Sequence, residues 1–168
     1  MAVPMLVRPT GSYRERGTKV FRSGNVTQHD LADGQVLHRR VNLYDVEEPL
    51  ALTREQVREA LGGRTAESRI DDAVLVAVEL VTNALRHTGS GPARMDLDVY
   101  EDTAVLWVHD GDTDAAAVRP SAHGDAPSLE LQENGRGLHL VDALATRWLV
   151  WPTAGGKAVV VEIGLLAE

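Results

Sequence analysis

The chain has 168 residues, with 25 acidic and 17 basic side chains and a formal charge of -8. This length suits one compact domain, and the acidic balance argues against nonspecific binding to nucleic acids or anionic lipids. The chain contains no cysteine, which excludes disulfides, thiolate catalysis and Cys-based zinc sites and fits a reducing compartment. The start lacks the apolar core of a signal peptide, and no segment approaches the roughly 18 to 20 apolar residues of a membrane span, so we expect a cytoplasmic protein.

Residues 1–33 are rich in Pro, Gly, Ser and Thr without a sustained hydrophobic period, which predicts a loosely ordered or peripheral segment. The compact domain is expected to cover 34–168. Its first predicted strand is 35–44. A short helix is expected next, with Thr53 as its cap, Gln56 completing a capping box, and two glycines ending it.

A long apolar run predicts a second helix over 70–87, which the glycines after it end. Alternating residues then predict two strands, 93–100 and 103–110, joined as a hairpin. About 25 residues without a period follow, and a loop of that length inside a compact domain is more often functional than idle. A third helix over 135–148 and two strands joined at a Gly-Gly turn complete the prediction of at least four strands and three helices.

The second predicted helix carries a polar stripe on an otherwise apolar cylinder. Glu79, Asn83 and His87 are spaced four apart, so each step turns only about 40° around the helix, and Arg86 lies in the same sector. Asn supplies a neutral oxygen ligand for Mg²⁺ beside phosphates, and Glu is able to orient or deprotonate a hydroxyl. The spacing alone is equally compatible with a stripe that reaches solvent near the helix end.

Two further places carry candidate chemistry. The sequence NGRGL, which contains Gly135 and Gly137, directly precedes the third predicted helix, where backbone amides and the helix dipole favour a phosphate. The spacing is not that of a Walker loop, and an ordinary turn gives the same pattern. Asp110 ends the strand VLWVHD, where a carboxylate accepts a hydrogen bond from an exocyclic amine; a turn-forming Asp-Gly is the alternative.

Taken in order, these segments resemble the GHKL ATPase superfamily. ELVTNALRH resembles its N box, HDGD its first glycine box and NGRGLHLVDALA its second. The resemblance implies the Bergerat ATP-binding fold, which is an α/β (α+β) two-layer sandwich with a mixed, mostly antiparallel sheet covered on one face by helices. Within the superfamily, the short single-domain form resembles the bacterial anti-sigma factor serine/threonine kinases.

The resemblance also implies a role for each site residue. Asn83 would bind the Mg²⁺ that bridges the phosphates of ATP, Glu79 would act as the general base, and Asp110 would bind the adenine amine. The loop over 111–134 would be the lid. The residues expected to contact the phosphates are Gly135, Arg136, Gly137 and Leu138, together with His87, for which a role at the helix C-terminus is an equal alternative.

The implied activity is that of a kinase that binds a sigma factor and phosphorylates an anti-anti-sigma (STAS-type) protein on a Ser or Thr hydroxyl. The same resemblance implies a homodimer. Three departures favour an alternative, a non-catalytic partner-binding regulator with weak or absent ATP binding. Asp112 replaces a small residue of the first glycine box, Lys157 and Ala158 stand where the family has a Thr, and the predicted lid is acidic. A detached histidine-kinase domain and a nucleotide-free metal site on the second helix rank lower.

Overall fold

Seven strands form one sheet in the computed structural model, which describes residues 19–20, 26–28, 34–87, 89, 91–111 and 134–166. The strand order is β1-β2-β3-β4-β5-β7-β6, and every pairing among these strands is antiparallel. The strands are β1 (Lys19–Val20), β2 (Val26–Gln28), β3 (Leu37–Asn42), β4 (Pro92–Val99), β5 (Thr103–Asp110), β6 (Arg147–Thr153) and β7 (Gly156–Gly164). The predicted hairpin of β4 and β5 is confirmed.

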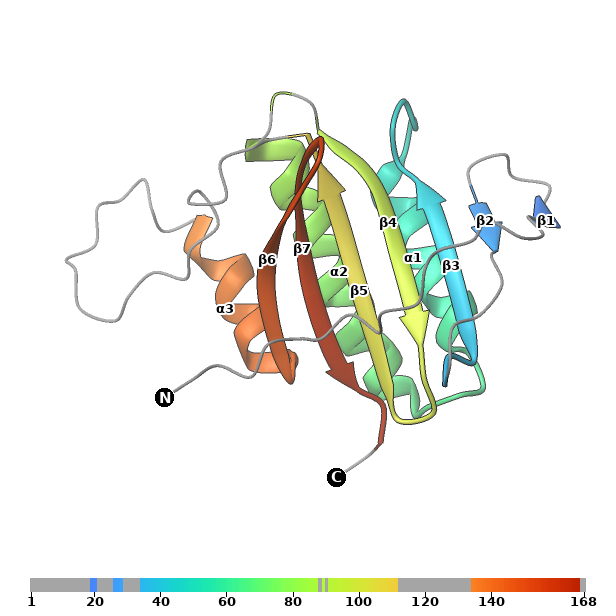
Figure 1. Cartoon of the computed structure of the whole chain (residues 1–168). Coiled ribbons are helices and arrows are strands. Elements are labelled where there is room, and N and C mark those ends of the chain that lie inside the picture. Colours follow the sequence, from blue (N-terminus) through green and yellow to red (C-terminus); the bar gives the residue numbers. More distant parts are fainter. Residues whose placement is uncertain are drawn as a thin grey trace.

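Three helices cover one face of this sheet (Figure 1): α1 (Pro49–Leu61), α2 (Glu67–His87) and α3 (Asn134–Leu144). Alternate residues of a strand point to opposite faces, so Leu97 of β4 and Leu106 of β5 both reach the helices and are buried there. They join one core with Val76 and Val81 of α2. The expected two-layer α+β sandwich, with helices on one face only, is therefore confirmed.

The first helix begins earlier than the capping box predicted. α1 starts at Pro49, a residue whose fixed φ suits the first helical turn. Thr53 lies inside the helix, fully buried, and its hydroxyl donates to the Pro49 carbonyl. Gln56 is also buried, and its side-chain oxygen accepts a hydrogen bond from Arg39 of β3 at 3.0 Å. Neither residue therefore caps α1, and Gln56 binds the helix to the sheet.

The other helix ends also differ from the prediction. α2 starts at Glu67, so the predicted start at residue 70 was three residues late. α3 starts at Asn134 and ends at Leu144, and Trp148 belongs to strand β6. NGRGL is thus the first turn of α3 itself. No helix within the described ranges is both long and apolar enough to cross a membrane.

The prediction of a loosely ordered or peripheral segment over 1–33 stays a prediction, because the structure describes only five residues of it. Residues 19–20 and 26–28 form β1 and β2, which extend the sheet beside β3. The rest of that segment, and the predicted lid after Gly111, lie outside the described residues.

Candidate functional site

The predicted polar stripe of α2 is present on a helix whose other side is core. Leu80, Val81 and Ala84 are buried against the sheet, whereas Glu79 and Asn83 are only half-buried. In the part of the chain that the structure describes, neither Glu79 nor Asn83 has a recorded hydrogen bond or ion pair. The helix therefore offers a carboxylate and a carboxamide, one turn apart, to a partner other than the core.

The end of the stripe is only partly described. Arg86 is exposed, and His87 is the last residue of α2, with a side chain outside the described residues. The prediction that His87 approaches phosphates consequently stays a prediction.

The first turn of α3 packs beside α2. It contains Gly135, Arg136 and Gly137, whose side-chain surroundings are outside the described residues, followed by Leu138, which is buried. The first backbone amides of a helix have no acceptor within the helix, and they carry the positive end of its dipole. This turn is accordingly able to hold an anion by its backbone alone.

Asp110 is the last residue of β5 and faces the helices. Its strand neighbours Leu106 and Val108 point into the same core, which places the Asp110 carboxylate on that side. Directly opposite in β7 is Lys157, whose Nζ lies 3.4 Å from Asp110 Oδ1. The side chains of Asp110 and Lys157 are only 5% and 3% exposed, so they form a buried ion pair.

This ion pair was not predicted. The sequence showed only that Lys157 stands where the family has a Thr, and the partner of its ammonium depends on the register of β5 against β7. In the structure, that register places the Lys157 ammonium next to the Asp110 carboxylate, which is the group expected to bind adenine.

The backbone near Asp110 is held close by a glycine. A Cβ atom at Gly156, which has a φ of +152°, would lie 2.1 Å from the Asp110 backbone oxygen. Only glycine therefore allows the start of β7 to approach the end of β5 this closely. The approach fixes Lys157, the next residue, beside Asp110.

The candidate residues meet at one end of the molecule. Figure 1 shows the C-terminal ends of α2 and β5 and the β6–β7 turn at the same edge of the sheet, and α2 contacts both β5 and α3. The structure thus brings together the elements that carry Glu79, Asn83 and Asp110 with α3. Asp112, one of the three sequence departures, lies outside the described residues.

The comparisons with known proteins decide the family. Residues 46–163, which are well over half of the chain, match the model of the histidine kinase-like ATPase domain. The chain belongs to this family. A search of curated proteins finds no match. The predicted GHKL superfamily is confirmed, and membership of the histidine kinase-like ATPase domain family implies ATP binding.

The residues of this histidine kinase-like ATPase domain fit the phosphate side of a nucleotide. Among the described residues there is no cluster of three His, Cys, Asp or Glu side chains that would hold a metal by itself. Mg²⁺ is commonly bound by one or two protein oxygens together with substrate phosphates, and the amide oxygen of Asn83 is of the kind that could serve. The part of the site expected to bind the adenine base fits less well, because the Asp110 carboxylate already has Lys157 as a partner.

Proposed function

We propose that this histidine kinase-like ATPase domain is an ATP-dependent protein serine/threonine kinase of the anti-sigma type. It would bind a sigma factor, phosphorylate a STAS-type anti-anti-sigma protein on a hydroxyl, and act as a homodimer without contacting nucleic acid directly. The observation that carries the kinase proposal is the pair Glu79 and Asn83, half-buried on α2 with no recorded partner in the described residues. A carboxylate and an amide oxygen spaced this way suit proton transfer beside a bound cation.

Mg²⁺ and ATP would supply the charge neutralisation and the phosphoryl group of the reaction. The Asn83 amide oxygen would hold the cation, and Glu79 would take the proton from the attacking Ser or Thr hydroxyl. The hydroxyl oxygen forms its bond to the γ-phosphorus as the bond to the β-phosphate oxygen breaks, and ADP leaves. The α3 amides of Gly135 to Leu138 bind phosphate oxygens, and the carboxylate of Asp110 accepts from the adenine amine.

Phosphate transfer tests the role of Glu79. Glu79→Gln keeps the size of the side chain and removes its basicity, so transfer from labelled ATP to the antagonist protein should fall by about 10²-fold or more while ATP still binds. The control is Glu67→Gln on the same helix, which removes an exposed ion pair with Arg58 and should leave transfer unchanged. Equal transfer in wild type and Glu79→Gln would remove Glu79 from the mechanism.

Calorimetric titration with ATP tests the role of Asn83. Binding should be stronger with Mg²⁺ than without it, and Asn83→Ala should abolish most of that difference because the cation loses its protein ligand. Thr82→Ala, at a neighbouring half-buried position of α2, should keep the difference. An Asn83→Ala protein with an unchanged response to Mg²⁺ contradicts the proposed ligand.

The buried pair of Asp110 and Lys157 favours a second candidate, a regulator that binds partner proteins without transferring phosphate. A carboxylate held by an ammonium at 3.4 Å is less available to an adenine amine, which weakens ATP binding. Incubation with labelled ATP and candidate antagonist proteins separates the two functions. A kinase leaves covalent phosphate on the antagonist, whereas the regulator binds its partner and leaves none.

A further inference from the structure

The face of the sheet turned away from the helices carries aromatic and charged side chains. Val105, Trp107 and His109 of β5 point to this face, because they alternate with the core residues Leu106 and Val108. We call it the open face. It is the side opposite the candidate nucleotide site.

A small apolar cluster fixes an indole ring on the open face. Trp107 packs with Ala158 and Val160 of β7, apart from the main core. Its Nε1–H donates to Asp98 Oδ2 at 3.1 Å, and its ring stacks on His109 with centroids 6.4 Å apart. The position of Trp107 is therefore set by packing and by a hydrogen bond.

Next to this cluster, one carboxylate holds several basic groups. Asp96 accepts hydrogen bonds from Arg40 at 2.8 Å, and from Arg94 and His109 at 3.1 Å each. Burial raises the pKa of the Asp96 carboxyl, but the His109 hydrogen bond and the charges of Arg40 and Arg94 outweigh burial and hold this pKa well below its usual value. Arg40 and Arg94 therefore share one carboxylate, and Arg94 keeps the more exposed side chain of the two, 40% against 31%.

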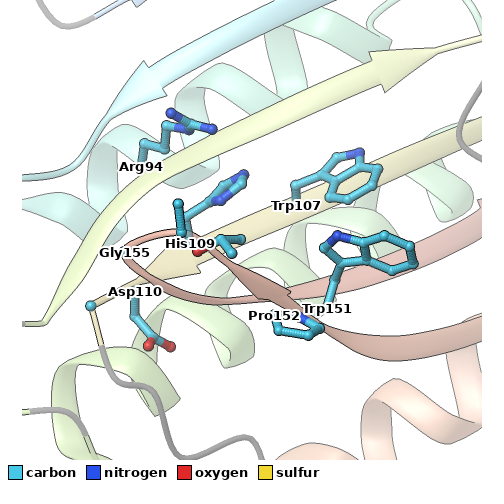
Figure 2. A pocket seen from close by; sticks show the side chains of 10 residues that line it. Arg94, Trp107, His109, Asp110, Trp151, Pro152 and Gly155 are labelled. Carbon is cyan, nitrogen blue, oxygen red and sulfur yellow. The ribbon is translucent and has the colours of Figure 1, made fainter. Parts of the chain in front are cut away.

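A cavity of about 490 Å³ lies on the open face, and its lining includes Arg94, Trp107 and His109. Figure 2 shows Trp107 and Trp151 side by side along one part of it and Arg94 with His109 along another. Two of the three tryptophans in the chain thus line one cavity, in a protein in which only 4% of residues are aromatic. The Asp110 carboxylate, which also borders the cavity, points away from these rings in Figure 2 and is paired with Lys157.

We propose that this cavity is a binding site for a small planar aromatic carboxylate. The ring of the ligand would pack on Trp151, which is 38% exposed, and the carboxylate would bind the guanidinium of Arg94. Arg94 is suited to this because only its Nε has a recorded bond within the described residues, to Asp96, and its side chain is 40% exposed. The cavity volume lies within the range of small-molecule sites, about 300 to 1,000 Å³.

The chemistry of the lining favours this class of ligand over others. A cationic ligand would meet the exposed guanidinium of Arg94, and an aliphatic carboxylate would leave the indole faces without a planar partner. A triphosphate needs several converging donors, and the cavity presents one exposed guanidinium.

The indole N–H resonances of the full chain provide the test, because each tryptophan gives its own signal in a nitrogen–proton correlation spectrum. With phenylacetate as the probe, the Trp151 and Trp107 signals should shift and saturate. The Trp148 signal should stay in place, since Trp148 packs against the main core and donates to Asp142. Acetate, which lacks the ring, and 2-phenylethanol, which lacks the charge, should each bind more weakly.

Arg94→Gln should weaken phenylacetate binding at least about tenfold, because a charged hydrogen bond is lost. Arg147→Gln is the matched control: Arg147 lies on the same face, is 45% exposed and pairs through Nε with Glu162 as Arg94 pairs with Asp96. It should bind as the wild type does. Trp151→Ala, at an exposed strand position, is a second variant and should also weaken phenylacetate binding. In this variant the Trp107 signal measures the binding.

The proposal is overturned if phenylacetate gives no saturable shift of the Trp151 signal, or if Arg94→Gln and Trp151→Ala both bind as tightly as wild type. Equal binding of acetate would also overturn it, because the ring would then contribute nothing.

Discussion

Replacing Lys157 by Met tests the buried ion pair at the candidate base site. Methionine keeps most of the length of the side chain and removes the ammonium that lies 3.4 Å from Asp110. The carboxylate would then be buried at 5% exposure without its counter-charge, and breaking a buried pair in this way costs about 3–5 kcal/mol. Removing both charges, in Lys157→Met with Asp110→Asn, should recover most of that loss, because no buried charge is left unpaired.

Urea unfolding of the wild type, the two single variants and the double variant measures this coupling directly. Arg147→Met is the control, since the ion pair of Arg147 with Glu162 is largely exposed on the arginine side and should contribute about 0–1 kcal/mol. If Lys157→Met lowers the free energy of unfolding by less than about 1 kcal/mol, the pair does not carry the buried charge interaction described above.

Three further predictions concern stability. Asp96→Asn should lower the melting temperature at neutral pH and should make the melting temperature fall less in acid. The pKa of the Asp96 carboxyl is lower in the folded chain than its unfolded value of 3.8, so the carboxylate stabilises the fold above pH 3.8. This stabilisation is lost as the pH falls below 3.8, and the Asn variant has none of it to lose. Gly156→Ala should lower the free energy of unfolding by about 2 kcal/mol or more in thermal unfolding, because the new Cβ would lie 2.1 Å from a backbone oxygen. Gly155→Ala is the control and should lower it far less, because its Cβ would meet nothing within 4 Å. Leu61→Ala, at a fully buried position, should cost about 2–5 kcal/mol in urea unfolding, against less than about 1 kcal/mol for Leu75→Ala, which is 42% exposed.

The sequence predicted the elements with a clear hydrophobic period but misplaced several helix ends. Strands β4 and β5 were found because apolar residues alternate along both, and α2 was found from its long apolar run. Thr53 was expected to cap α1 because Ser or Thr three residues before Gln is a local signal. The structure instead buries Thr53 inside the helix, which begins four residues earlier at Pro49.

Long-range pairing explains the other differences. Trp148 fits the apolar period of α3, yet it pairs with Val161 of β7 and so belongs to a strand. Lys157 and Asp110 are far apart in the sequence and meet only through the register of β5 and β7. The open-face cavity could have been suspected from the alternation of Trp107 and His109 with core residues, but its walls come from three different strands and the β6–β7 turn.

Adjacent residues of strand β5 face opposite sides of the sheet. His109 faces the open-face cavity, and Asp110 faces the helices and Lys157. A shift of one residue in the register of β5 would exchange these two side chains, and it would also move Leu106 and Val108 out of the core. The position of Asp110 is therefore enforced by the packing of the whole sheet. For this reason, substitutions at Lys157 test the part of the candidate nucleotide site that is expected to bind the adenine base.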